Sequence, residues 1–195
     1  MATYQSIRYN VDYQGNAGSL MPLLTFTSDG SDATADFASK IDSTYKEYLF
    51  IYNNIHPETD GANLSIQAST DSGSSYGVTM TASYFKAGHD EADTSADLSY
   101  STGDDIAQST GFHIFMNTGN DNNQASGGWL RLFNPASTTF VKHFISSSAN
   151  PTNDDYERSI YCGGYFNTAS AIDAIQFKMS SGEIQGGTIQ MFGVI

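Results

Sequence analysis

The sequence predicts an all-β protein, a single antiparallel and jelly-roll-like β-sandwich. Three observations predict it. Twelve Tyr and twelve Phe residues enrich the chain in side chains that favour strands. Gly, Ser, Asn and Asp interrupt the apolar runs at short intervals, which is typical of strands joined by turns. No amphipathic helical stretch of roughly 10–15 residues lies between those runs, which excludes a βαβ architecture.

Nine segments have the pattern of strands. Segment 45–53 carries apolar residues in both alternating sets, as expected of a strand covered on both faces. Segment 63–69 alternates cleanly, and the reversal at 70–75 predicts that it forms a β-hairpin with 76–84. The other predicted strands are 111–117, 128–134, 138–146, 159–166, 171–179 and 187–195.

The remaining segments divide the chain into an arm and one domain. Residues 1–28 are predicted to form an N-terminal arm or an edge strand, because Pro22 disfavours a central strand. Segment 33–41 is compatible with a short helix or a loop, and the acidic segment 88–105 with a long loop. No shift of composition marks a linker, so we expect residues 29–195 to form one sandwich domain.

The charge of the chain is strongly negative, with 21 acidic and 8 basic residues and a formal net charge of −13. The basic residues are scattered, whereas a nucleic-acid partner requires clustered Lys and Arg. The first residues lack the basic and then apolar pattern of a secretory signal. No apolar run approaches the roughly 20 residues that span a bilayer. We expect a protein made in a cytoplasm without a signal peptide, with neither nucleic acid nor membrane as partner.

Catalytic motifs are missing from the pattern. The four histidines lie far apart in sequence, and no Gly-x-Ser-x-Gly elbow is present. Glu47, Glu157 and Glu183 are isolated carboxylates, and nothing pairs two of them for glycoside hydrolysis. Cys162, the single cysteine, has the surroundings of a small buried apolar residue. The sequence therefore predicts that the protein is not an enzyme.

An acidic cluster offers a candidate metal site. Asp90, Asp93 and Asp97 belong to the acidic segment, and carboxylate oxygens are the ligands that Ca²⁺ prefers. Their spacing is not that of an EF-hand, and no bidentate Glu closes the loop. We expect no cofactor, with calcium at these residues as the alternative to a solvated acidic loop.

Aromatic residues beside polar segments offer a candidate ligand site. Trp129, Tyr100 and Tyr156 could present amphipathic rings to a glycan. The alternative interpretation is packing in the core, since buried aromatic residues fill a sandwich.

Two stretches carry a resemblance to known proteins. The first is Tyr48-Leu49-Phe50-Ile51-Tyr52-Asn53-Asn54-Ile55-His56-Pro57 together with the reversal at 69–76. The second is the C-terminal segment 172–195, taken as a hairpin, which ends in Gly187-Thr188-Ile189-Gln190-Met191-Phe192-Gly193-Val194-Ile195. Together they resemble small β-sandwich virion surface proteins of tailed bacteriophages.

The resemblance implies a function by contact. Such proteins serve as capsid decoration or cement proteins, or as fibre or knob modules, and commonly assemble as trimers. We therefore expect a virion protein, made in the host cytoplasm, that binds the major capsid protein or another virion protein. It would decorate the capsid and stabilise it by bridging shell subunits. A carbohydrate- or receptor-binding tip module of a tail fibre or head fibre is the alternative.

Overall fold

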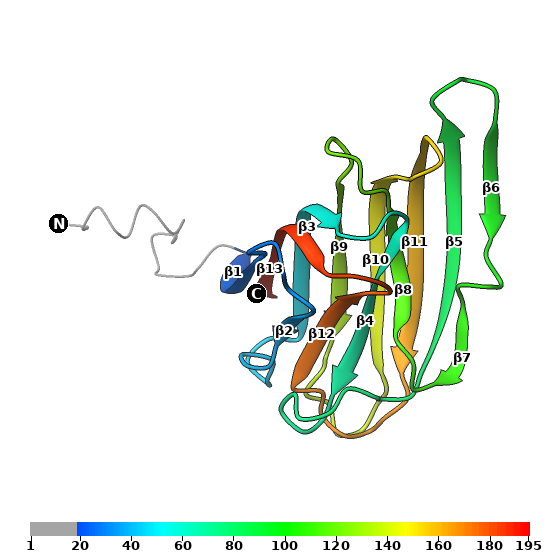
Figure 1. The fold of residues 1–195 in the computed structure, drawn as a ribbon. Helices are drawn as coiled ribbons and strands as arrows, with labels where there is room; N and C mark the ends of the chain where they lie inside the picture. The colour runs from blue at the N-terminus through cyan, green and yellow to red at the C-terminus, as the bar shows by residue number, and fades with distance from the viewer. Residues whose placement is uncertain (1–18) are drawn as a thin grey trace.

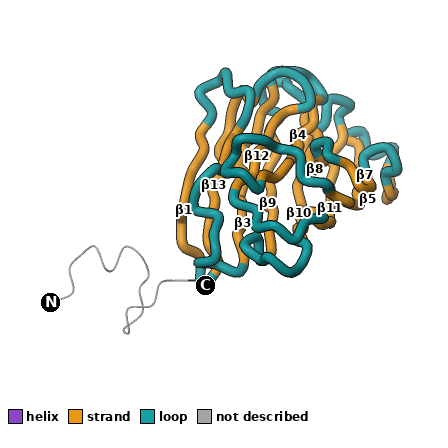
Figure 2. The backbone as a smooth tube through the Cα atoms, turned by 90° about the horizontal axis from the view of Figure 1, so that it is seen from below, coloured by secondary structure: helices purple, strands orange, loops and turns teal. Residues whose placement is uncertain are grey.

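The computed structural model describes residues 19–195, and every helix or strand in that range is a β-strand (Figures 1 and 2). The strands are β1 (Leu20–Thr27), β2 (Ala35–Phe37), β3 (Glu47–Pro57), β4 (Ala62–Ser69), β5 (Met80–Asp90), β6 (Ala96–Tyr100), β7 (Ile106–Ser109), β8 (His113–Thr118), β9 (Ser126–Phe133), β10 (Lys142–Pro151), β11 (Tyr156–Phe166), β12 (Ala174–Met179) and β13 (Ile184–Val194). No helix in this range is long and apolar enough to cross a membrane.

The strands form two antiparallel sheets of unequal width. The large sheet has the order β1-β13-β3-β9-β10-β11-β5-β6, and β7 also pairs with β5; the small sheet has the order β2-β12-β4-β8. The small sheet covers the middle of one face of the large sheet, and β5, β6 and β7 extend beyond it (Figure 1). The prediction of an all-β antiparallel sandwich is confirmed.

Successive strands cross repeatedly from one sheet to the other. β1 and β3 belong to the large sheet, whereas β2 and β4 belong to the small one; β8 and β9 alternate in the same way, as do β12 and β13. Two insertions, β5–β7 and β10–β11, both widen the large sheet. Both predicted hairpins are therefore wrong. β4 pairs with β12 and β8, not with β5, and β13 lies in a different sheet from β12.

Two other predicted segments also differ from the structure. The segment predicted as a long loop, 88–105, contains the end of β5 and all of β6, which pair as a hairpin. Segment 33–41 contains the strand β2, not a helix. The polar residues of β6 obscured the strand pattern because this edge of the large sheet is largely exposed on both faces, whereas β2 has only three residues.

The predicted arm falls partly within the described residues. Residues 20–27 form β1, an edge strand that pairs with β13, and the pairing shifts between Pro22 and Leu24. Residues 1–18 of the predicted arm lie outside the described residues. The backbone N–H of Ile195 donates to the carbonyl of Ser19 at 3.1 Å, so both ends of the described chain lie at the β1–β13 side (Figure 1).

Aromatic rings hold the two sheets together. Phe177 of the small sheet lies at the centre, with its ring centroid 5.8 Å from Phe37 and 5.9 Å from Phe115 of the same sheet. Its contact with Phe50 of the large sheet, at 5.4 Å, joins the two sheets. These contacts are edge-to-face, the arrangement that aromatic quadrupoles favour. All four side chains are buried, and they belong to one core cluster that joins both sheets.

Phe177→Ala is expected to lower the free energy of unfolding by about 3–5 kcal/mol, because it removes a fully buried ring and leaves a cavity. Urea unfolding measures this loss. Phe140→Ala is the matched control, since Phe140 is 68% exposed and its truncation should change stability by less than about 0.5 kcal/mol. Equal effects of the two substitutions would contradict the central role of Phe177.

Candidate functional site

The outer face of the large sheet, turned away from the small sheet, carries the largest exposed apolar side chains of the strands. Side chains alternate along each strand, so one set packs inward and the other points outward. On β3, for example, Tyr48, Phe50 and Tyr52 are buried in the core. The outward set of the neighbouring strands includes side chains that are 37–77% exposed: Phe85, Leu98, Tyr100, Trp129, Ile145 and Tyr161. Exposed apolar patches of this kind mark contact sites.

The register of the strands aligns four of these aromatic residues in one row. Trp129 of β9 lies opposite Ser147 of β10, and Ser147 lies opposite Tyr161 of β11. Tyr161 lies opposite Phe85 of β5, which lies opposite Tyr100 of β6. At about 4.8 Å per strand, the row extends over roughly 19 Å from Trp129 to Tyr100.

One half of the row forms a projecting ridge, defined here as Phe85, Leu98, Tyr100 and Tyr161. The rings of Phe85 and Tyr161 are stacked, with centroids 5.2 Å apart and planes at 14°. Because this separation is close to the spacing of their strands, the rings face each other and direct their edges away from the sheet. The Tyr100 hydroxyl donates to Asp105 Oδ2 at 2.6 Å, and this bond raises the pKa of the phenol.

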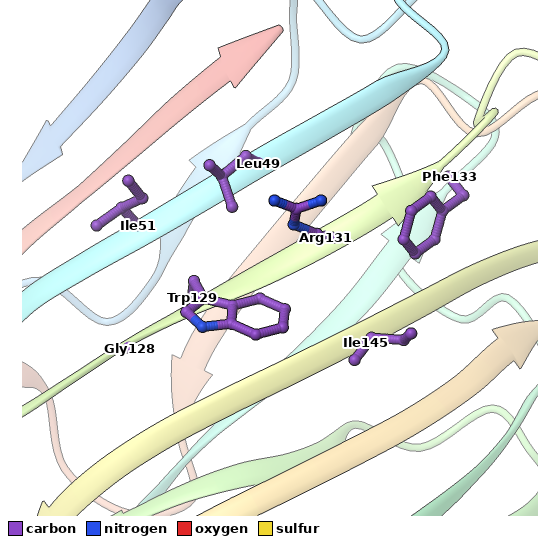
Figure 3. Close-up of a pocket in the computed structure, with 7 residues that line it drawn as sticks. All are labelled: Leu49, Ile51, Gly128, Trp129, Arg131, Phe133 and Ile145. Carbon is purple, nitrogen blue, oxygen red and sulfur yellow. The ribbon is translucent and has the colours of Figure 1, made fainter. Parts of the chain in front are cut away.

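The other half of the row borders an open groove of about 580 Å³. Leu49 and Ile51 of β3 line it on one side, and Ile145 of β10 on the other (Figure 3). The remaining lining residues belong to β9: Gly128, Trp129, Arg131 and Phe133.

One charged side chain lies in the groove, and it is paired. Arg131 Nη1 lies 2.9 Å from Glu47 Oε1, and the guanidinium lies 5.8 Å from the centre of the Trp129 ring. The groove is therefore apolar, with its single lining cation neutralised by a neighbouring carboxylate.

A glycine shapes the floor beneath Trp129. The Tyr52 hydroxyl passes under β9 and donates to the carbonyl of Trp129 at 2.6 Å. A Cβ added at Gly128 would lie 2.7 Å from Tyr52 Cε2 and would also overlap the carbonyl of Ser147. Only glycine leaves room for the Tyr52 ring here, and this explains the glycine that precedes Trp129 in the sequence.

Acidic residues are nearly excluded from the outer face. Among the described strands β3, β5, β6, β9, β10 and β11, only Glu47 and Glu157 place a carboxylate at an outward position. Glu47 is the partner of Arg131, and Glu157 lies near the start of β11. A third carboxylate, that of Asp105 in the loop after β6, accepts a hydrogen bond from the Tyr100 hydroxyl at the edge of the face. The outward positions of these strands thus carry few of the 21 acidic residues of the chain.

The structure places two of the three predicted ligand residues on the same face but does not bring them together, because the row separates them by roughly 19 Å. Trp129 and Tyr100 lie in the same row, four strands apart, and the core-packing interpretation is wrong for Trp129, which is 37% exposed. Tyr156 belongs to the same alternating set of β11 as the buried residues Ile160 and Cys162, so its side chain points to the inner face of the sheet, away from Trp129. Its ring lies under the guanidinium of Arg158, at 4.5 Å.

The three predicted metal ligands each have a different protein partner. Asp90 accepts hydrogen bonds from the hydroxyl and backbone N–H of Thr94 and from the N–H of Ser95, and these bonds lower its pKa. Asp93 lies 3.4 Å from His89, and Asp97 lies 3.6 Å from Arg158. Within residues 19–195, no three His, Cys, Asp or Glu side chains form a group that could hold a metal ion. Calcium binding stays a prediction without a geometric site.

Three titratable groups lie enclosed between the sheets. His113 packs against Phe144, with ring centroids 6.0 Å apart, and burial lowers the pKa of its imidazole to about 4. Burial raises the pKa of the Cys162 thiol to about 12, so the residue is a small protonated core side chain, as its sequence surroundings indicate. Lys142 Nζ donates to the carbonyl of Thr168 at 3.0 Å, and burial lowers its pKa. All three side chains are at most 2% exposed, so a substrate cannot reach them.

Sequence reasoning did not identify Phe85, Ile145 and Tyr161. Their strands carry apolar residues in both alternating sets, so the pattern does not distinguish the inward set from the outward set. The register of the strands aligns Tyr161 and Phe85 with Trp129 and places Ile145 opposite Arg131, and that register depends on the tertiary structure.

Comparisons of the chain with family models, with curated proteins and with solved structures found no match. The geometry of the outer face is therefore the main support for a function.

Acid is expected to destabilise the protein through His113, whose ring nitrogens have no hydrogen-bond partner within the described residues. The imidazole of His113 has a pKa of 6.5 in the unfolded chain, and burial lowers this pKa to about 4 in the folded chain. The negative charges of Asp104 and Asp105 offset part of the lowering by burial. The free energy of unfolding should fall by up to about 3 kcal/mol as the pH falls through this range. Urea unfolding at several pH values measures the slope. His113→Phe should flatten it between pH 7 and 5, and an unchanged slope would contradict the assignment.

Gly128→Ala is expected to destabilise the fold by about 1–3 kcal/mol, because the added methyl group overpacks the space taken by Tyr52. Gly127→Ala is the matched control, since its Cβ would meet only the Tyr52 carbonyl at 3.6 Å, an ordinary contact. Thermal unfolding with Trp129 fluorescence reports both stability and the environment of the indole. An equal loss of stability in Gly127→Ala and Gly128→Ala would mean that replacing either glycine of the strand is destabilising, and would contradict a specific overlap with Tyr52.

Proposed function

We propose that this chain is a structural protein of the tailed-bacteriophage virion that decorates the capsid and stabilises it by bridging shell subunits. One observation supports this best. The outer face of the large sheet presents an apolar groove and an aromatic ridge on a rigid support, almost without carboxylates. Such a surface is suited to contact with protein.

The order of the strands also supports the proposal. Eight strands alternate between the sheet orders β1-β13-β3-β9 and β2-β12-β4-β8. We infer that they form a jelly roll, an arrangement of two Greek keys that recurs in viral capsid proteins. The insertions β5–β7 and β10–β11 extend only the large sheet and therefore enlarge the face that carries the contact surface.

The proposed mechanism is mechanical. Each copy, as part of a homo-trimer, binds the major capsid protein or another virion protein, and burial of the interface stabilises the assembled shell by mass action. The protein is made in the host cytoplasm, enters the virion without export, and performs no chemical reaction. Nucleic acid and membrane are not its partners.

A carbohydrate- or receptor-binding tip module is the second candidate. Trp129 is exposed beside the groove, and Tyr100 lies in the same row, so both could contact a glycan. The apolar lining of the groove and its single paired charge favour a protein partner instead, because a sugar needs polar groups for its hydroxyls.

Location in the particle tests the proposal. The protein should co-migrate with heads when purified particles are disrupted, and heads that lack it should lose their genome at a lower temperature. Immunodetection of separated heads and tails gives the location, and a dye-release melt gives the stability. Detection at a tail tip, with glycan binding that Trp129→Ala weakens, would favour the second candidate. A protein missing from particles would contradict both.

A further inference from the structure

We infer that the outer face of the large sheet is the surface through which copies of this chain bind one another, with the ridge of one copy in the groove of the next. This goes beyond the proposed virion role, since it names the surface through which copies of the chain meet; contact with the capsid then falls to the surfaces that the assembly leaves exposed. The support comes from the position of the patches, their area and their charge.

The two patches lie on opposite sides of the middle of the sheet. The groove is formed by β3, β9 and β10, and the ridge by β11, β5 and β6, so the boundary falls between β10 and β11. A two-fold axis along the strands at this boundary would place each ridge over the partner's groove. Separate patches that complement each other can also be joined head to tail in a closed ring of three copies. In either symmetry, the ridge of one copy lies in the groove of another copy.

The exposed area is sufficient for a specific contact. The six most exposed apolar side chains of the face are Phe85, Leu98, Tyr100, Trp129, Ile145 and Tyr161. Large side chains bury about 150–250 Å² each when covered, so six that are roughly half exposed offer about 500 Å². This area lies in the upper part of the roughly 300–600 Å² of the largest apolar patch on a typical monomer, a patch that often marks a contact site. With the groove walls it would form the apolar centre of an interface of roughly 800 Å² per partner.

The charge of the face favours a second copy over a different partner. Each copy has a formal net charge of −13, so two copies approach most easily through a surface on which carboxylates are few. On this face Glu47 is neutralised by Arg131 at 2.9 Å, Glu157 lies towards the end of the sheet, and Asp105 accepts a hydrogen bond from the Tyr100 hydroxyl at the edge of the ridge. A face that met a basic partner would benefit from keeping its carboxylates.

The orientation of the rings favours protein over glycan. A sugar stacks on the face of an aromatic ring, but the rings of Phe85 and Tyr161 are stacked on each other, 5.2 Å apart. Their exposed edges suit insertion between apolar side chains such as those of Ile51 and Ile145 in the groove.

Molar mass in solution tests the inference on the full chain without particles. Light scattering and sedimentation should give a dimer or a trimer for the wild type. Tyr161→Glu in the ridge and Ile145→Lys in the groove should each weaken association at least about tenfold. Phe140→Glu, which adds the same charge at a residue that is 68% exposed and lies in the loop between β9 and β10, outside the strands that form the ridge and the groove, should not weaken it. Far-UV circular dichroism checks that each variant is folded.

A mixture of two variants makes the test specific to ridge and groove. Tyr161→Glu and Ile145→Lys, each dissociated alone, should associate when mixed, because their opposite charges meet in the shared contact. A monomeric wild type, an equal loss in Phe140→Glu, or a mixture that stays monomeric would overturn the inference. A monomer that binds glycans through Trp129 would also overturn it. These masses do not depend on where the protein lies in a particle, so failure here and failure of the virion proposal can be told apart.

Discussion

The alternation of side chains along the strands of the large sheet is the constraint on which the other features depend. One set of side chains meets the small sheet around Phe177, and this contact fixes which set is inward. The alternate side chains of the same strands must then point to the outer face. A shift of one residue in the register of β9 would exchange buried Leu130 for exposed Trp129, so the stability of the core and the composition of the surface are determined together.

Because the large sheet is wider than the small sheet, its outward side chains form an extended surface. The insertions β5–β7 and β10–β11 add strands to the large sheet alone, and the ridge lies on three of them. The groove lies mainly on strands of the eight-strand framework, with Ile145 contributed by the first inserted strand after it. The surface is thus shared between framework and insertions, and its two halves are held in register by the continuous pairing from β9 through β10 and β11 to β5.

The interior contains polar groups that are held by hydrogen bonds to the backbone. The Tyr52 hydroxyl donates a hydrogen bond to the Trp129 carbonyl, and Lys142 Nζ donates one to the carbonyl of Thr168. His113 differs from these two, since both of its ring nitrogens lack a hydrogen-bond partner within the described chain, as do Ser146 Oγ and Asn150 Oδ1. A neutral imidazole tolerates that position, whereas an imidazolium would be buried without a counter-charge in contact, which makes the core sensitive to acid.

Local residue patterns alone determined the β class of this protein and most of its strands, because strand propensity and turn residues act between neighbours in the chain. The sequence also shows directly that segments such as 126–133 and 142–149 contain no Asp or Glu. The strand partners were not determined locally. The reversals after Ser69 and Met179 look like hairpin turns, yet the chain crosses to the other sheet at both, since burial against the facing sheet outweighs pairing with the adjacent segment. The row of Trp129, Tyr161, Phe85 and Tyr100 likewise depends on the pairing of strands that are distant in the chain, such as β11 and β5, where Tyr161 lies opposite Phe85. Only the tertiary structure decided which aromatic residues face solvent, because both alternating sets are apolar and only the position of the small sheet distinguishes them.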